Sequence, residues 1–172
     1  TLPFAINAPN KEQVYDTIDQ LLDKIISKDI QSLGKFDSDT LGIIKRILYI
    51  VAESDTVSFN KMEQLLPIRR ITIMNVFDVL EKAELLIRVS AYGANTTGAK
   101  KPTKYLFMSP VIRQALMGMT GLAETTKTRE GKLIEDVFGI HVYREFITPG
   151  VGNLSYDSAE NGADFILQIA SD

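Results

Sequence analysis

The spacing of apolar residues predicts helices in the first part of the chain. Apolar side chains recur at every third or fourth position from Val14 to Ile26, which predicts one amphipathic helix. Asn10 has the position of its N-cap, and Gly34 is expected to end it. A second apolar stripe runs from Ile43 to Val51 and predicts a helix whose cap lies within 37–39.

The next part of the chain predicts two short helices and two strands. The helices are expected over 58–66 and 69–83, with a turn at Pro67 between them. Strands are expected over 85–92 and 103–108, on either side of a loop rich in Gly, Thr and Lys. Together with the helix that precedes them, these elements have the order of a winged helix-turn-helix.

The last part of the chain predicts a small α/β unit. A short helix is expected from Pro110 to Leu116, followed by a Gly/Thr/Ala-rich linker over 118–127. A longer helix is expected from Gly131 towards Phe146, and strands over 154–156 and 163–169. One helix and one hairpin make an incomplete layer, so this unit is expected to lack further strands.

These elements predict an α+β chain in three parts. Residues 1–36 form a helical lead-in, residues 37–117 form a mainly helical winged helix-turn-helix, and residues 128–172 form a partial α/β unit. A hydrophobic content of 45% fits an ordinary globular protein, and no apolar run approaches the roughly 20 residues that cross a membrane. The chain has no cysteine, which excludes disulfides and thiolate metal sites and fits a cytoplasmic location.

Charge is distributed unevenly along the chain. Residues 39–110 contain 10 Lys and Arg against 7 Asp and Glu, whereas both flanking parts have an excess of acidic residues. A basic module within an acidic chain is what attraction to a phosphate backbone requires, but an excess of three positive charges fits an ordinary mixed surface equally well. The candidate DNA contacts lie at the start of the second helix of the motif and in the loop between the strands. They are Arg69, Arg70, Thr72, Asn75, Lys100, Lys101 and Lys104.

The same helix also supports a second interpretation. Ile71 lies between the candidate DNA contacts and suits a protein contact, while Asp78, Glu81 and Glu84 would repel phosphate. Because winged helices also serve as protein-docking modules, the fold does not decide between DNA and a protein partner. Both interpretations stay open.

The sequence gives less support for a nucleotide-binding site or a metal site. The stretch Gly93–Ala99 resembles a phosphate-binding P-loop, but Ala99 occupies the position of the required lysine, so no nucleotide site is expected in this chain. Glu135 on a helix and Asp164 on a strand could together hold Mg²⁺ in a nuclease. The Glu-x-Lys strand that such a site needs is absent, which favours two ordinary acidic residues. With one histidine, His141, no metal site is expected.

Six stretches along the chain together have the order of motifs known from one family. They are Leu2-Pro3, Ile26–Ile30, Ile68–Leu86, Lys104–Ser109, Gly131–Glu135 and Ala163–Ile166. In these stretches the chain resembles the prokaryotic AAA+-like ATPases that carry a winged helix and then a C-terminal domain of unknown function with a restriction-endonuclease-like fold. Arg69 and Glu84 depart from the family pattern, where serine and glycine stand.

The resemblance implies a role as the regulatory and DNA-engaging C-terminal region of an ATPase. The lead-in would follow the ATPase lid, and ATP and Mg²⁺ would bind upstream of Thr1, leaving this chain without a cofactor and non-catalytic by itself. The Glu-x-Lys strand would lie downstream, so Glu135 and Asp164 would be the remnant of a nuclease site. The expected partners are duplex DNA, the upstream ATPase domain and a second copy of the chain, with no membrane.

Overall fold

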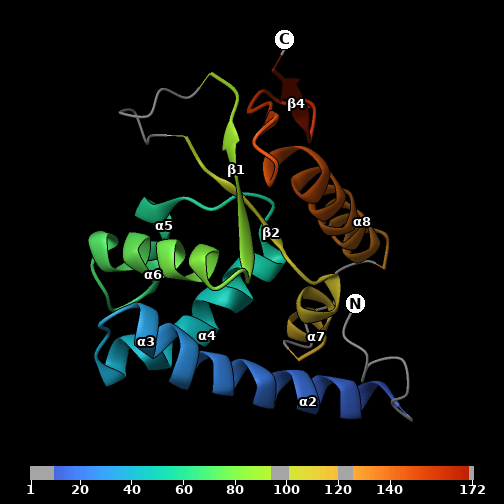
Figure 1. Ribbon diagram of the computed structural model, residues 1–172. Helices are drawn as coiled ribbons and strands as arrows, with labels where there is room; N and C mark the ends of the chain where they lie inside the picture. The colour runs from blue at the N-terminus through green and yellow to red at the C-terminus, as the bar shows by residue number, and fades with distance from the viewer. Residues whose placement is uncertain (1–9, 94–100, 120–125, 171–172) are drawn as a thin grey trace.

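The protein is a mixed α+β molecule built from helices and one four-stranded sheet (Figure 1). The computed structural model describes residues 10–93, 101–119 and 126–170. The α+β class predicted from the sequence is confirmed. No helix within those ranges is long and apolar enough to cross a membrane.

The first helical segment begins at a side-chain cap. Asn10 accepts a hydrogen bond from the N–H of Gln13 at 2.8 Å and so starts α2, Lys11–Lys24. The helix continues through a π-helical segment, η1 (Ile25–Ile30), and a short helix, α3 (Gln31–Leu33). The predicted start and end of this segment are confirmed. Its apolar stripe is buried against the rest of the helical core.

The next three helices form the main core. Asp37 caps α4 (Ser38–Glu53) by accepting the N–H of Thr40 at 2.7 Å. The short helix α5 (Phe59–Leu65) precedes α6 (Arg70–Lys82). The side chains at the centre of this core include Ile44, Leu48, Phe77 and Leu80, none of which is exposed.

The strands and the last helices alternate along the rest of the chain. They are β1 (Leu86–Ala91), β2 (Lys104–Phe107), α7 (Pro110–Met119), α8 (Thr126–Val142), η2 (Tyr143–Ile147), β3 (Gly152–Tyr156) and β4 (Ile166–Ile169). The helix predicted from Gly131 therefore begins earlier, at Thr126, and ends in a π-helical turn. Within the predicted linker, residues 118 and 119 belong to α7, and residues 120–125 lie outside the described residues.

The sheet joins the two C-terminal parts that the sequence separates. Its strand order is β2-β1-β3-β4, and both sequence-adjacent pairs are antiparallel. The link between them is a parallel pairing of β1 with β3, in which Ser90 lies opposite Ser155 and Ala91 opposite Tyr156. The terminal hairpin therefore extends the first hairpin, and the predicted boundary at 118–127 falls between two helices that serve the same sheet.

A second, smaller core lies under α8. Tyr105 and Phe107 of β2 face the helical core, while Leu106 between them belongs to the cluster beneath α8. Gly139 makes this packing possible, because a Cβ there would lie 2.1 Å from Cδ1 of Leu106. The alternation of β2 thus places every second side chain under α8, and Lys104 is on that same face.

Candidate functional site

The first turn of α6 presents the basic residues predicted to contact DNA. Arg69 is the N-cap residue, with extended backbone and an exposed side chain. The backbone N–H of Arg70 donates to Oε1 of Glu63 at 2.8 Å, so α5 supplies the cap that α6 lacks at its own N-cap. Within the described ranges, neither guanidinium group of Arg69 and Arg70 is in an ion pair. Both positive charges are therefore uncompensated by a carboxylate among the described residues.

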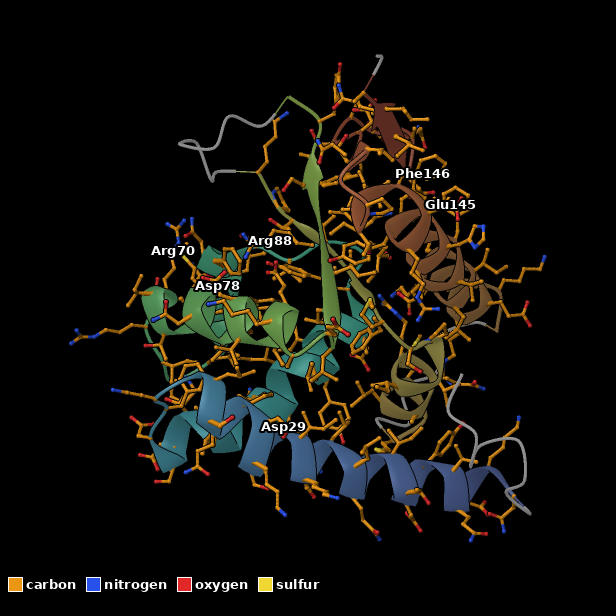
Figure 2. The ribbon with its side chains drawn as sticks, viewed as in Figure 1. Asp29, Arg70, Asp78, Arg88, Glu145 and Phe146 are labelled. Carbon is orange, nitrogen blue, oxygen red and sulfur yellow. The ribbon has the colours of Figure 1, made fainter. Side chains whose placement is uncertain are left out.

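The acidic residues farther along α6 are partly neutralised by a strand residue. Arg88 of β1 forms ion pairs with Asp78 at 2.8 Å and with Glu81 at 2.7 Å. Figure 2 shows Asp78 and Arg88 next to each other, with Arg70 nearer the start of the helix. Burial raises the pKa of Glu81, against the attraction of Arg88. Because Arg88 pairs with both carboxylates, the repulsion of phosphate expected from Asp78 and Glu81 is weakened.

Arg88 was not among the residues predicted for this site, although the sequence contains a signal for it. Arg88 lies between Ile87 and Val89 in β1, and strand alternation places its side chain on the opposite face from theirs. Both neighbours are buried, while Arg88 reaches the carboxylates of α6. The period-2 pattern would have predicted its exposure, but not the ion pairs.

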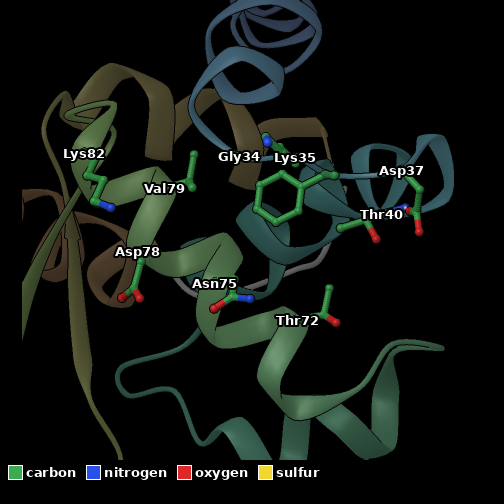
Figure 3. Close-up of a pocket in the computed structure, with 10 residues that line it drawn as sticks. Gly34, Lys35, Asp37, Thr40, Thr72, Asn75, Asp78, Val79 and Lys82 are labelled. Atoms are coloured by element: carbon green, nitrogen blue, oxygen red, sulfur yellow. The ribbon is translucent and has the colours of Figure 1, made fainter.

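Thr72 and Asn75 lie on the border of a polar cavity, where Thr72 is half-buried and Asn75 is exposed. The cavity is open to solvent, has a volume of about 490 Å³, and lies between α6 and the segment that leads into α4. Figure 3 shows Thr72 and Asn75 on the α6 side and Asp37 with Thr40 on the other. Ile71 points away from the protein, with 61% of its surface exposed. The first turn therefore combines exposed Arg69 and Ile71 with half-buried Arg70.

The three lysines predicted to contact DNA from the loop and the strand after it differ in position and in contacts. Lys100 lies outside the described residues. Lys101 is exposed, and its Nζ donates to Oγ of Ser158 at 3.1 Å. Lys104 is only 4% exposed, and its ammonium group contacts Glu135 and Asp164. Lys104 is therefore not placed as the sequence predicted, because α8 covers this face of β2 and its charge is already compensated.

The structure brings together the two carboxylates proposed as a nuclease remnant. Nζ of Lys104 lies 2.8 Å from Oε2 of Glu135 and 2.8 Å from Oδ1 of Asp164, and 5.2 Å from the ring centre of Phe165. Burial on its own lowers the pKa of Lys104, but the hydrogen bonds and charges of Asp164 and Glu135 outweigh it, so the pKa is raised. The lysine remains charged and holds α8 to the terminal hairpin.

This arrangement has a clear electrostatic consequence. The ammonium group occupies the space between the two carboxylates where a divalent cation would bridge them, so such a cation would first have to displace Lys104. Among the residues with a described position, no group of three or more His, Cys, Asp or Glu side chains could hold a metal ion. The geometry of Glu135 and Asp164 is that of a structural ion-pair cluster.

A second buried network fixes α8 on the helical core. Arg113 of α7 donates from Nε to Asp136 at 2.7 Å and from Nη1 to the carbonyl of Ala52 at 2.9 Å. The other oxygen of Asp136 accepts the N–H of Phe107 at 2.9 Å. Lys132 donates to the carbonyl of Glu53, so two basic side chains satisfy the C-terminal carbonyls of α4. No local pattern in the sequence indicated this network, since its members are far apart along the chain.

Comparison with known proteins gives a family without an assigned activity. Over 169 residues, the chain is 34% identical to the uncharacterized protein MJ1637 of Methanocaldococcus jannaschii, covering 97% of this chain and 35% of that protein. The chain therefore spans about a third of the length of this relative. No solved structure matches the chain. A family model matches residues 1–123, and the chain therefore belongs to the family described as a domain of unknown function, DUF8612.

Proposed function

We propose that this chain is a winged helix-turn-helix module that binds duplex DNA through the first turn of α6. The observation that carries the proposal is the pair of arginines at the start of this helix, exposed Arg69 and half-buried Arg70, without ion-pair partners in the described residues. Basic side chains at the start of a helix favour phosphate oxygens through their charges. The N–H of Arg70 is already donated to Glu63, so the proposal rests on the two guanidinium groups.

The rest of the module supports the same mode of binding. The helices α4, α5 and α6 precede the β1–β2 hairpin, the order in which a winged helix presents its second helix to the major groove. Lys101 at the end of the β1–β2 loop would lie along the phosphate backbone. Arg88 neutralises part of the acidic charge on α6. Lys104 has no part in this interface.

The salt dependence of binding tests this proposal. Fluorescence anisotropy with a short labelled duplex should give an affinity that falls as salt rises. The Arg69→Ala/Arg70→Ala variant should bind at least about tenfold more weakly and lose about one to two units of the logarithmic salt slope, since each lost phosphate contact removes about one. The control is Lys11→Ala/Lys24→Ala, which removes two exposed positive charges from α2. Equal losses in both variants would contradict a site on α6.

One observation favours a protein partner for the same surface. Ile71 is 61% exposed between Arg70 and Thr72, and an exposed aliphatic side chain cannot contact phosphate, whereas it can be buried against a protein. If α6 docks on a protein, the wild-type chain should show no detectable binding to DNA. The Ile71→Ser variant should then lose binding to the protein partner. If α6 binds DNA, Ile71→Ser should leave the affinity within about twofold, because the phosphate contacts remain.

The proposed context is the C-terminal region of an AAA+-like ATPase. The support is the family resemblance of the sequence and the much greater length of MJ1637, of which this chain matches 35%. The ATPase itself would lie outside this chain. ATP hydrolysis measured on the longer protein, with and without duplex DNA, tests this context. Hydrolysis should be absent from the 172-residue chain alone and should depend on DNA in the longer protein.

A further inference from the structure

The outward face of α6 carries side chains spaced four, three and four positions apart. They are Ile71, Asn75, Asp78 and Lys82, and all of them are exposed. Residues at this spacing lie on one face of a helix. An aliphatic group, an amide, a carboxylate and an ammonium group therefore follow one another along this face. The face is chemically mixed and differs from a uniformly basic surface.

The polar groups of this face differ in the contacts that they already make. The carboxylate of Asp78 is held by the guanidinium group of Arg88 at 2.8 Å. The amide of Asn75 has no hydrogen-bond partner among the described residues, and Figure 3 shows it on α6 between Thr72 and Asp78. An asparagine amide presents a donor and an acceptor side by side. Asn75 is therefore the residue of this face that can both donate to and accept from a ligand.

The amide and the aliphatic group match the major-groove edge of A·T base pairs. An asparagine accepts from N6–H of adenine and donates to its N7, and an aliphatic side chain packs on the C5-methyl group of thymine. A carboxylate would read cytosine and a lysine would read guanine. Asp78 is occupied by Arg88, and Lys82 lies in the last turn, whereas the N-terminal part of a recognition helix approaches the bases. The chemistry of Ile71 and Asn75 therefore favours A·T pairs.

We propose that Asn75 binds the edge of an adenine in the major groove and that Ile71 contacts the methyl group of a nearby thymine. This inference rests on the proposed function, because Arg69 and Arg70 must hold α6 against the phosphates. Four residues advance a helix by about 6 Å, and successive base pairs are about 3.4 Å apart. The thymine therefore lies one or two base pairs from the adenine. The exposed isoleucine thereby has a contact in the DNA interface.

Selection from duplexes with a randomised core tests this base readout. The full chain at low salt should enrich duplexes that contain an adenine and a thymine at a fixed spacing. In fluorescence anisotropy, replacing the A·T pair of the adenine by a G·C pair should weaken wild-type binding at least about fivefold. Asn75→Ala should bind the two duplexes within about twofold of each other. The matched control, Lys82→Ala on the same face, should keep the wild-type preference, because a phosphate contact carries no sequence information.

Modified bases test the two contacts at the level of single atoms. Replacing the adenine by 7-deazaadenine removes the N7 acceptor, which should weaken wild-type binding by about threefold or more and leave Asn75→Ala unchanged. Replacing the thymine by deoxyuridine removes the methyl group, which should cost about twofold in the wild type and nothing in Ile71→Ser. Equal losses in the wild type and the variant would overturn the contact assigned to that residue.

These experiments separate failure of the base readout from failure of the proposed function. Binding without a preferred base pair, or an Asn75→Ala variant that keeps the wild-type preference, would overturn the base readout and leave the DNA-binding site on α6 in place. No detectable binding, or binding that Arg69→Ala/Arg70→Ala does not weaken, would overturn both. Asn75→Ala should retain the fold, because alanine favours an exposed helical position more than asparagine does, and circular dichroism checks this.

Discussion

The buried pair of Arg113 and Asp136 makes a sharp prediction about stability. The side chain of Arg113 is 3% exposed and that of Asp136 is not exposed. Asp136→Ala would leave the guanidinium charge buried without its carboxylate and the N–H of Phe107 without an acceptor. Breaking a buried ion pair in this way costs about 3–5 kcal/mol, a large share of the roughly 5–15 kcal/mol that stabilises a typical domain.

Urea unfolding followed by circular dichroism measures this loss. With a slope of about 2 kcal/mol per molar urea, the midpoint should fall by about 2 M. Asp164→Ala is the control, because its side chain is 67% exposed and its ion pair should contribute under about 1 kcal/mol. The double variant Arg113→Met/Asp136→Leu should be more stable than Asp136→Ala, since no charge is then left buried. A loss below about 1 kcal/mol in Asp136→Ala would refute this reasoning.

Two further predictions concern α8 and Lys104. Gly139→Ala should destabilise the protein by about 1–3 kcal/mol, because its Cβ would overlap Leu106. The control is Gly131→Ala in the same helix, where a Cβ meets nothing within 4 Å and should stabilise the protein by up to about 1 kcal/mol. Equal urea-unfolding midpoints for the two variants would count against the close packing. The pKa of Lys104 is raised by its two carboxylate partners, so its contribution to stability is complete below about pH 10 and is lost as pH rises through the raised value. Lys104→Met should therefore remove part of the alkaline loss of stability in pH-dependent unfolding, and an unchanged alkaline profile would contradict the ion-pair geometry.

Local signals in the sequence predicted most helices well. Asn10 and Asp37 are caps that act on backbone groups three residues away, so their effect is visible in the sequence itself. The β1–β2 hairpin was predicted for a similar reason, because two apolar runs flank a loop with turn-forming residues. Interactions over a few residues need no knowledge of the rest of the fold.

The contacts that join distant segments could not be predicted in the same way. Ser90 pairs with Ser155 across more than sixty residues, and nothing in either strand specifies its partner. Lys104 shows the consequence for the site. It was assigned to the DNA surface because it follows a basic loop, but α8 packs over its face of β2 and supplies Glu135 to its ammonium group. The sequence placed Glu135 and Asp164 in one site, and only the fold shows the lysine between them.

NMR mapping of the DNA contact tests the central claim most directly. Amide chemical shifts of the full chain would be followed as a short duplex is added at low salt. We expect changes concentrated at Arg69, Arg70 and the first turn of α6, with further changes at Lys101 and little effect on the amides around Lys104. Shifts confined to other surfaces, or no shifts at concentrations well above micromolar, would contradict the assignment of α6 as the DNA-binding element.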